Sequence, residues 1–286
     1  MNIKLNGFFN LFLRFSFIFI LITTYFLSIN LGFSAPKKEL IEHWIEFNPK
    51  STEVIQYPTW QKFLANYLKV DNEQTLIAYQ SVTAKDKIAL AQAIQRLESI
   101  PVENYNRKEQ LAYWINLYNM ETVYLILEHY PIQSIKDISS GFFSFGPWDE
   151  KLFTINGQKL SLNDIEHGII RPIWNDPRIH AAVNCASMSC PNLRPTPFEG
   201  KKIYTQLNQA FSQFVNSDKG VRVKGNSIFL SEIFNWYAED FGTQNKDILD
   251  FILIYASPAL KQKIKNIPKN NIDYQFNRYD WSLNQT

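Results

Sequence analysis

Residues 108–130 read KEQLAYWINLYNMETVYLILEHY, and this stretch decides the fold. At about 100° per residue its apolar side chains fall on every side of a helix, which is typical of a helix buried at the centre of a domain. Pro131 ends the pattern. The segment is not a membrane span, because Asn116, Asn119 and Glu121 interrupt it. We therefore predict one long, buried, central helix.

Two amides on this helix are the first candidate functional groups. Asn116 and Asn119 are expected to be buried, and an empty hydrogen-bonding position on a buried amide costs about 1–3 kcal/mol. In one interpretation both side chains anchor neighbouring loops. In the other, one of them orients a catalytic imidazole or supplies an oxyanion donor.

Hairpins and short helices surround the central helix in the sequence. Residues 152–161, LFTINGQKLS, predict a hairpin that turns at Asn156-Gly157, the type I′ dipeptide. Residues 220–231, GVRVKGNSIFLS, predict a second hairpin. Helical spacing dominates most of the remainder, and the polar, Asn-rich C-terminus is expected to fray. The predicted fold class is α+β, mainly helical, with the long buried helix packed on a small antiparallel sheet of hairpins.

A short helix is predicted over 162–171, ended by Pro172. Glu166 lies at the edge of its apolar face. This carboxylate either forms a salt bridge with Arg171 or Arg178, or acts as a general acid or orienting group.

His167 and Arg171 are four residues apart in the same helix and are expected together on the side opposite Glu166.

Both cysteines of the chain lie in IHAAVNCASMSCP, residues 179–191. Alternation over 179–184 predicts a strand with His180 on the less apolar face. Cys190 follows a five-residue loop after the strand and can therefore lie on the same face as His180, which makes it the preferred nucleophile. Cys185 is then expected to be a packing residue. Three polar residues complete this part of the candidate site: Asn184, Ser187 and Ser189.

The N-terminus indicates export. Lys4 and Arg14 precede a long apolar run, and small residues near Ser34 suit cleavage by signal peptidase. The run is also long enough for an uncleaved membrane anchor. Either alternative places the remaining chain in the periplasm, where disulfides persist.

The charge balance argues against a nucleic-acid partner. The chain has 29 basic and 27 acidic side chains, and residues 1–34 hold two of the basic and none of the acidic ones. The remainder is therefore formally neutral, without the basic excess of nucleic-acid-binding domains.

Four segments together resemble a known family. They are AYWINLYN, SLNDIEHGIIR, DPRIHAAVNCASMSCPNL and LSEIFNWYAEDFG. The set resembles the bacterial and plant family called domain of unknown function 547, over about residues 85–255. The resemblance implies that its motif residues converge on one site, without implying a chemistry. We accordingly divide the chain into the targeting segment 1–34, accessory helices 35–84, the core domain 85–256, and a C-terminal helix and tail 257–286.

Three functions stay open at this stage. The first is a non-catalytic domain for ligand binding or scaffolding, with a Cys185–Cys190 disulfide. The second is a Cys–His hydrolase or acyltransferase acting on peptides or cell-wall amides, in which Cys190 and His180 react and Asn119 or Glu166 orients the imidazole. Papain-like and transglutaminase-like enzymes usually carry the nucleophile at the start of the buried helix, however, and this helix has no cysteine.

The third is a zinc site made from both cysteines with His180 and His167. No cofactor is expected, and the predicted partner is an unidentified ligand or peptide.

Overall fold

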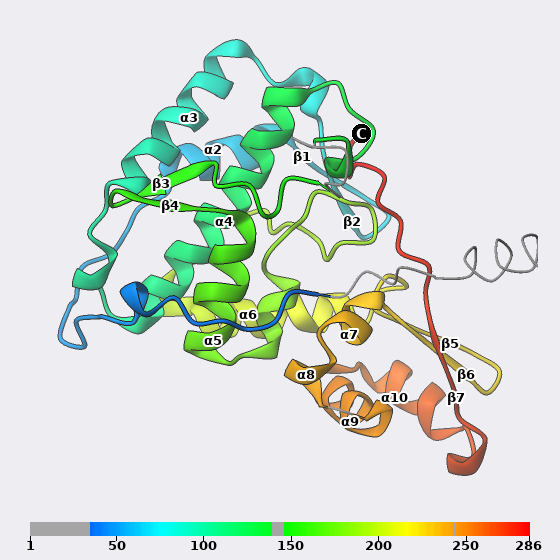
Figure 1. The fold of residues 1–286 in the computed structure, drawn as a ribbon. Coiled ribbons are helices and arrows are strands. Elements are labelled where there is room, and N and C mark those ends of the chain that lie inside the picture. Colours follow the sequence, from blue (N-terminus) through cyan, green and yellow to red (C-terminus); the bar gives the residue numbers. More distant parts are fainter. Residues whose placement is uncertain (1–34, 139–145, 243) are drawn as a thin grey trace, which may run out of the picture. The chain divides into compact units, whose positions relative to one another are not determined.

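Helix α4 (Arg107–His129) runs through the core of residues 36–286 (Figure 1). The side chain of Asn106 begins the helix by accepting the backbone N–H groups of Lys108 and Glu109. Its side chains from Glu109 to Leu127 are buried except Tyr124. The predicted central helix is confirmed, with ends one residue from those expected.

This computed structural model describes residues 35–138, 146–242 and 244–286, and the chain divides into Met1–Ala35 and Pro36–Thr286. The predicted targeting segment, residues 1–34, lies outside the described residues. No described helix is both long and apolar enough to cross a bilayer.

The described part is mainly helical, as predicted. The other α-helices are α2 (Pro58–Tyr67), α3 (Ala84–Glu98), α5 (Arg171–Trp174), α6 (Ile203–Val215), α7 (Glu232–Trp236), α8 (Ala238–Phe241), α9 (Asn245–Tyr255) and α10 (Pro258–Lys265). The most extensive contacts of α4 are with α3, α6, the π-helix Asp164–Ile170 and the turn Gly200–Lys202. The central helix therefore packs mostly on other helices, and the hairpins lie around it.

Three small sheets complete the fold. They comprise β1 (Leu68–Asp71) with β2 (Gln74–Ile77), β3 (Phe153–Ile155) with β4 (Gln158–Leu160), and β5 (Val221–Lys224) with β6 (Ser227–Leu230) and β7 (Asp273–Phe276). Both predicted hairpins are confirmed. Positive φ angles of 47° at Asn156 and 79° at Gly157 fit the predicted turn. Strand β7 pairs with β6 in parallel.

The C-terminus is ordered, so the expected fraying is wrong. Leu283 and Asn284 are buried, and the carbonyl of Asn284 accepts the backbone N–H of Ile77 at 2.8 Å. Because Ser187 forms an isolated antiparallel bridge with Leu283, the tail also lies against the cysteine segment.

The predicted strand 179–184 is also wrong. Residues Pro177–Ala181 form a 3-10 helix, which the side chain of Asp176 begins by accepting the N–H of Arg178. Proline fixes its own φ in the helical range and an aspartate before it is a strong cap, so these local signals prevail over the alternation.

Candidate functional site

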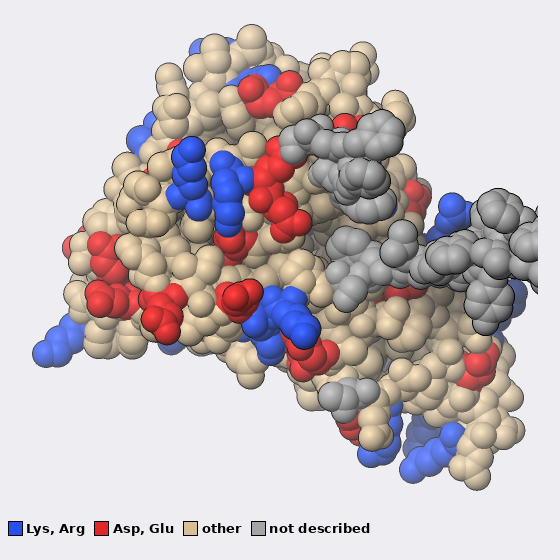
Figure 2. Space-filling view, viewed as in Figure 1, with Lys and Arg blue, Asp and Glu red and all other residues tan. Residues whose placement is uncertain are grey.

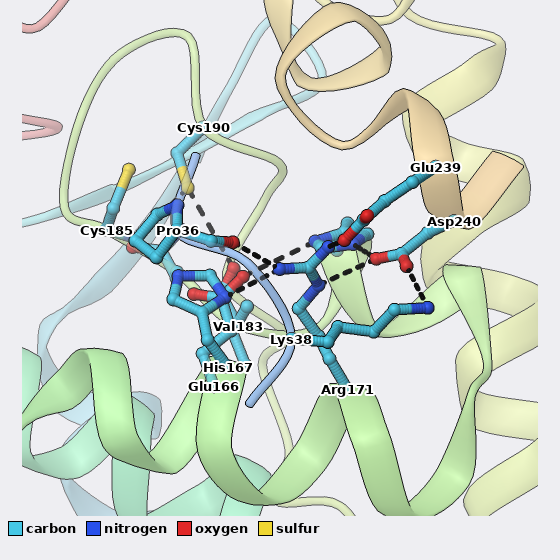
Figure 3. Close-up of polar contacts among 12 residues, drawn as sticks. Pro36, Lys38, Glu166, His167, Arg171, Val183, Cys185, Cys190, Glu239 and Asp240 are labelled. Atoms are coloured by element: carbon cyan, nitrogen blue, oxygen red, sulfur yellow. Dashed lines mark hydrogen bonds and ion pairs between the residues drawn. The ribbon is translucent and has the colours of Figure 1, made fainter. Parts of the chain in front are cut away.

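A buried ion network lies between the π-helix and α8. The guanidinium of Arg171 donates from Nε to Asp240 Oδ2 at 2.7 Å and from Nη2 to Glu239 Oε1 at 2.8 Å. Its Nη1 donates to the carbonyl of Pro36 at 2.8 Å (Figure 3). The Arg171 side chain is only 1% exposed, so its charge depends on these acceptors.

The π-helix explains how its side chains converge. The N–H of Arg171 bonds to Glu166 O, five residues back. At that spacing the carbonyl of His167 would take the N–H of Pro172, which has none. The helix therefore continues through Pro172 to Trp174, and the prediction that it ends at the proline is wrong.

The π spacing also changes the angle between successive side chains. His167 and Arg171 were expected on the side of the helix opposite Glu166. Instead, Arg171 Nη1 lies 3.1 Å from His167 Nδ1, and Glu166 faces the same network through His180.

His180 lies between two carboxylates. Its Nε2 is 2.7 Å from Asp240 Oδ2, and its Nδ1 is 3.4 Å from Glu166 Oε1, without hydrogen-bond alignment. The imidazole stacks on Tyr237, with ring centroids 3.9 Å apart and planes at 19°. Both ring nitrogens thus face carboxylate oxygens.

The charges in this network shift its pKa values. Burial would raise the pKa of Glu166, but its interactions with His167, His180 and Arg171 outweigh burial and lower that pKa to about 2. For Asp240 too, burial is outweighed, by hydrogen bonds from His180 and Arg171, and its pKa lies below the usual range. Burial lowers the pKa of His167.

His167 has a defined tautomer in this arrangement. A guanidinium only donates, so the Nδ1 of His167 must accept from Arg171. The neutral ring then carries its proton on Nε2.

The buried amides anchor loops, as the first interpretation predicted. Asn116 donates to Phe198 O at 2.8 Å and accepts from Phe198 N at 2.9 Å. Asn119 donates to Ala182 O at 2.9 Å and accepts from Asn184 N at 2.8 Å. Asn119 therefore fixes the backbone immediately before Cys185.

The side chain of Asn184 joins the two ends of the turn that carries the cysteines, residues 184–191. Its side chain donates to Pro191 O at 2.7 Å and accepts from Ala186 N at 2.9 Å. Ser189 instead contacts the C-terminal segment, because its hydroxyl accepts the backbone N–H of Asp280 at 2.8 Å. Arg178 makes its ion pair with Asp176, away from the carboxylates of the network.

Both cysteines are free thiols, so the predicted disulfide is absent. Cys190 is buried and its sulfur accepts the backbone N–H of Cys185 at 3.1 Å. Cys185 is half-buried, and its sulfur lies 3.2 Å from Ser187 Oγ and 3.3 Å from the Tyr279 hydroxyl. The structure thus reverses the predicted roles, because the packed thiol is Cys190 and the accessible one is Cys185.

The two thiols also differ in acidity. Hydrogen bonds with Cys190, Ser187 and Tyr279 outweigh burial and lower the pKa of Cys185 to about 7. Burial and the neighbouring Cys185 raise the pKa of Cys190. Ala186, which follows the acidic thiol, has a φ of 58°, a conformation that non-glycine residues seldom adopt.

The thiols and the ion network are neighbouring parts of one region. Figure 3 shows Arg171 between the carbonyl of Pro36 and the carboxylates of Glu239 and Asp240. Tyr118 is influenced electrostatically by Glu166 and by both cysteines. Among the described residues, however, no hydrogen bond joins either thiol to His180.

Sequence reasoning missed several residues of the region. They are Lys38, Tyr237, Glu239, Asp240 and Tyr279. Three of these lie in LSEIFNWYAEDFG, the motif quoted for the resemblance, so the signal was present. The acidic pair and Tyr237 lie more than 50 residues from Arg171 and His180 in the chain, so no local pattern pairs them.

The geometry gives no support to the zinc hypothesis. Within 35–138, 146–242 and 244–286, no group of three or more His, Cys, Asp or Glu side chains is placed to hold a metal ion. His167 and His180 are directed at Arg171 and at carboxylates instead of at the thiols.

Residues 102–215 match the family described as "Protein of unknown function, DUF547". The matched stretch covers less than half of the chain. The match includes α4, the π-helix and the cysteine segment, and it confirms the resemblance inferred from the motifs. Asp240, Tyr237 and Tyr279 lie beyond the matched residues of the DUF547 domain. Comparisons with curated proteins and with solved structures give no match.

Proposed function

We propose that the DUF547 domain of this protein is a thiol enzyme of the hydrolase or acyltransferase class, with Cys185 as its nucleophile. The observation that carries the proposal is the environment of the Cys185 sulfur, which is half-buried and contacts two hydroxyl groups. A thiolate is the reactive form of cysteine, and a pKa of about 7 makes it abundant at neutral pH.

The hydroxyl pair supplies the means to stabilise the thiolate. Ser187 Oγ donates to the Tyr279 hydroxyl at 3.1 Å, which leaves the tyrosine proton to donate to the Cys185 sulfur. Cys190, whose raised pKa keeps its proton, is a further donor to the same sulfur. These neutral donors take the place of the imidazole that we first assigned to the nucleophile.

An aromatic surface beside the thiol offers a place for substrate. The ring of Tyr279 lies 4.7 Å from that of Trp236 and 4.6 Å from that of Trp281, between centroids. All three residues are half-buried. Rings of this kind bind apolar or planar groups next to a reacting atom.

The proposed reaction passes through a thioester. The Cys185 thiolate bonds to the acyl carbon of an ester or amide, the carbon–oxygen or carbon–nitrogen bond breaks, and the leaving alcohol or amine takes a proton from water, which the second step returns. Water or an amine then takes the acyl group and restores the thiolate. In this scheme His180, Glu166 and Asn119 are positioning residues. Export of the domain to the periplasm is part of the proposal and rests on the basic and apolar pattern of residues 1–34.

The test is intact-mass spectrometry of the purified protein after brief exposure to an activated ester, such as p-nitrophenyl acetate. We expect one acetyl group per chain on Cys185, none on Cys185→Ser, and continued labelling of Cys190→Ser. Acetylation that persists in Cys185→Ser at the wild-type rate would refute the assignment.

One observation favours a non-catalytic function instead. Arg171, His180, Glu166 and Asp240 satisfy one another, as structural ion networks do. A protein in which Cys185 reacts no faster than a free cysteine would support this second candidate.

A further inference from the structure

Residues 36–41 lie as an extended strap over the π-helix, seen in dark blue across the helix of residues 164–174 (Figure 1). The N–H of Glu39 donates to His167 O at 3.1 Å, and the N–H of Ile41 donates to Gly168 O at 2.9 Å. The carbonyl of Pro36 accepts from Arg171. These are main-chain contacts at alternating positions, the pattern by which proteins bind extended peptides.

The helix provides these acceptors because of its own sequence. Pro172 has no N–H to give to the carbonyl of His167, so that oxygen is open to another donor. Gly168 lets a chain pass closely, since a Cβ there would lie 2.6 Å from Ile41 Cδ1.

Lys38 of the strap forms an ion pair with Asp240. Lys38 Nζ lies 2.9 Å from Asp240 Oδ1 and 3.1 Å from Asn175 Oδ1. Asp240 is only 7% exposed, so the ion pair is partly desolvated and stronger than a surface pair. Neighbouring Lys37 is exposed and has no partner among the described residues.

The strap itself is weakly anchored. Leu40 is 42% exposed, Lys37 and Glu39 are exposed, and Ile41 packs against the core as a partly buried side chain. A segment held mainly by polar contacts opens at low free-energy cost. In the view of Figure 2, acidic and basic side chains are interspersed over this face.

We infer that the surface formed by the carbonyls of His167 and Gly168 with Arg171 and Asp240 is a binding site for an extended peptide, which residues 36–41 occupy in cis. The ligand is an extended peptide that repeats the contacts of the strap. It has a carbonyl at the position of Pro36, a lysine at the position of Lys38, and backbone N–H groups at the positions of Glu39 and Ile41. This inference is independent of the thiol chemistry, because none of its contacts involves a cysteine.

The test measures binding of a fluorescent peptide, acetyl-Pro-Lys-Lys-Glu-Leu-Ile-amide, to the full chain by anisotropy. In Lys38→Glu the strap is repelled by Asp240, so the added peptide meets less competition. We expect about tenfold tighter binding to this variant than to the wild type, as removal of a partly desolvated charge contact implies. Lys37→Glu is the matched control and should bind as the wild type does.

Two further measurements test whether the peptide binds at the site of the strap and whether each variant is folded. Gly168→Ala should weaken peptide binding, because its Cβ would lie 2.6 Å from Ile41 Cδ1 and the isoleucine side chain would have to move. Thermal melting checks that every variant is folded. Equal peptide binding by Lys38→Glu and Lys37→Glu, or no binding by folded Lys38→Glu, would overturn the inference and make the strap a fixed part of the fold.

Discussion

His180 and Asp240, 60 residues apart in the chain, meet at 2.7 Å between Nε2 and Oδ2, and Arg171 Nε lies 2.7 Å from the same oxygen. One carboxylate thus joins the 3-10 helix Pro177–Ala181 and α5 to α8. This contact connects the DUF547 domain to a residue outside its matched range.

Replacing Asp240 should destabilise the protein strongly. Asp240→Ala leaves Arg171 and His180 buried without their shared partner, and breaking a buried pair typically costs about 3–5 kcal/mol. Glu239→Ala is the control, since Glu239 is 51% exposed and should cost less than about 1 kcal/mol. Urea denaturation measures both. Similar losses for the two variants would contradict the central role of Asp240.

Acid should destabilise the fold through Glu166. Its pKa is lowered from 4.5 to about 2, so its stabilising contribution is complete above about 4.5 and is lost as the pH falls toward 2. The contribution amounts to about 3 kcal/mol at most. Glu166→Gln should flatten this part of the curve of unfolding free energy against pH. An unchanged slope between about pH 5 and about pH 2 would argue against the ion network.

Glu121 should make the fold less stable as the pH rises, the opposite of the effect of Glu166. Burial on α4 raises its pKa, with a smaller contribution from Glu98, and its Oε1 has no hydrogen-bond partner. A carboxyl group with a raised pKa in the folded protein favours folding only while it is protonated. The free energy of unfolding therefore falls as the pH rises from the pKa of Glu121 in the unfolded chain toward its pKa in the folded protein. Glu121→Gln should therefore be more stable than the wild type at pH values near neutral, as measured by thermal melting. A variant that melts earlier at neutral pH would be inconsistent with this account.

How much the sequence predicts depends on how local the signal is. Helix α4 was predicted to within a residue because its continuous apolar pattern and the stop at Pro131 are local signals. The hairpin at Asn156-Gly157 followed from one dipeptide. The hairpin β1–β2 was missed because its turn uses Asn72 and Glu73, both at positive φ without a glycine.

Long-range partners could not be predicted in the same way. Nothing near Arg171 or His180 indicates that Asp240 will lie between them, and the parallel pairing of β7 with β6 joins strands more than 40 residues apart. The π-helix was missed because a proline after helical residues usually marks an end, whereas here the strap takes up the carbonyl that the proline leaves open.

Asn119 should control the thiol from a distance. Asn119→Leu leaves Ala182 O and Asn184 N unpaired, at a cost of about 1–3 kcal/mol for each buried group. Because Asn184 immediately precedes Cys185, alkylation of Cys185 should also slow. Asn116→Leu, which releases the loop at Phe198 instead, is the matched control and should cost stability while leaving the thiol rate unchanged. Equal effects of both variants on the thiol would refute this link.

The measurement that tests the central claim most directly is the rate of iodoacetamide alkylation of each cysteine against pH, followed by peptide mass mapping. The account predicts that Cys185 reacts first, with a midpoint at about 7, and that Cys190 stays unmodified in the folded protein. Faster reaction of Cys190, or a Cys185 midpoint at the ordinary value of about 8.5, would contradict it.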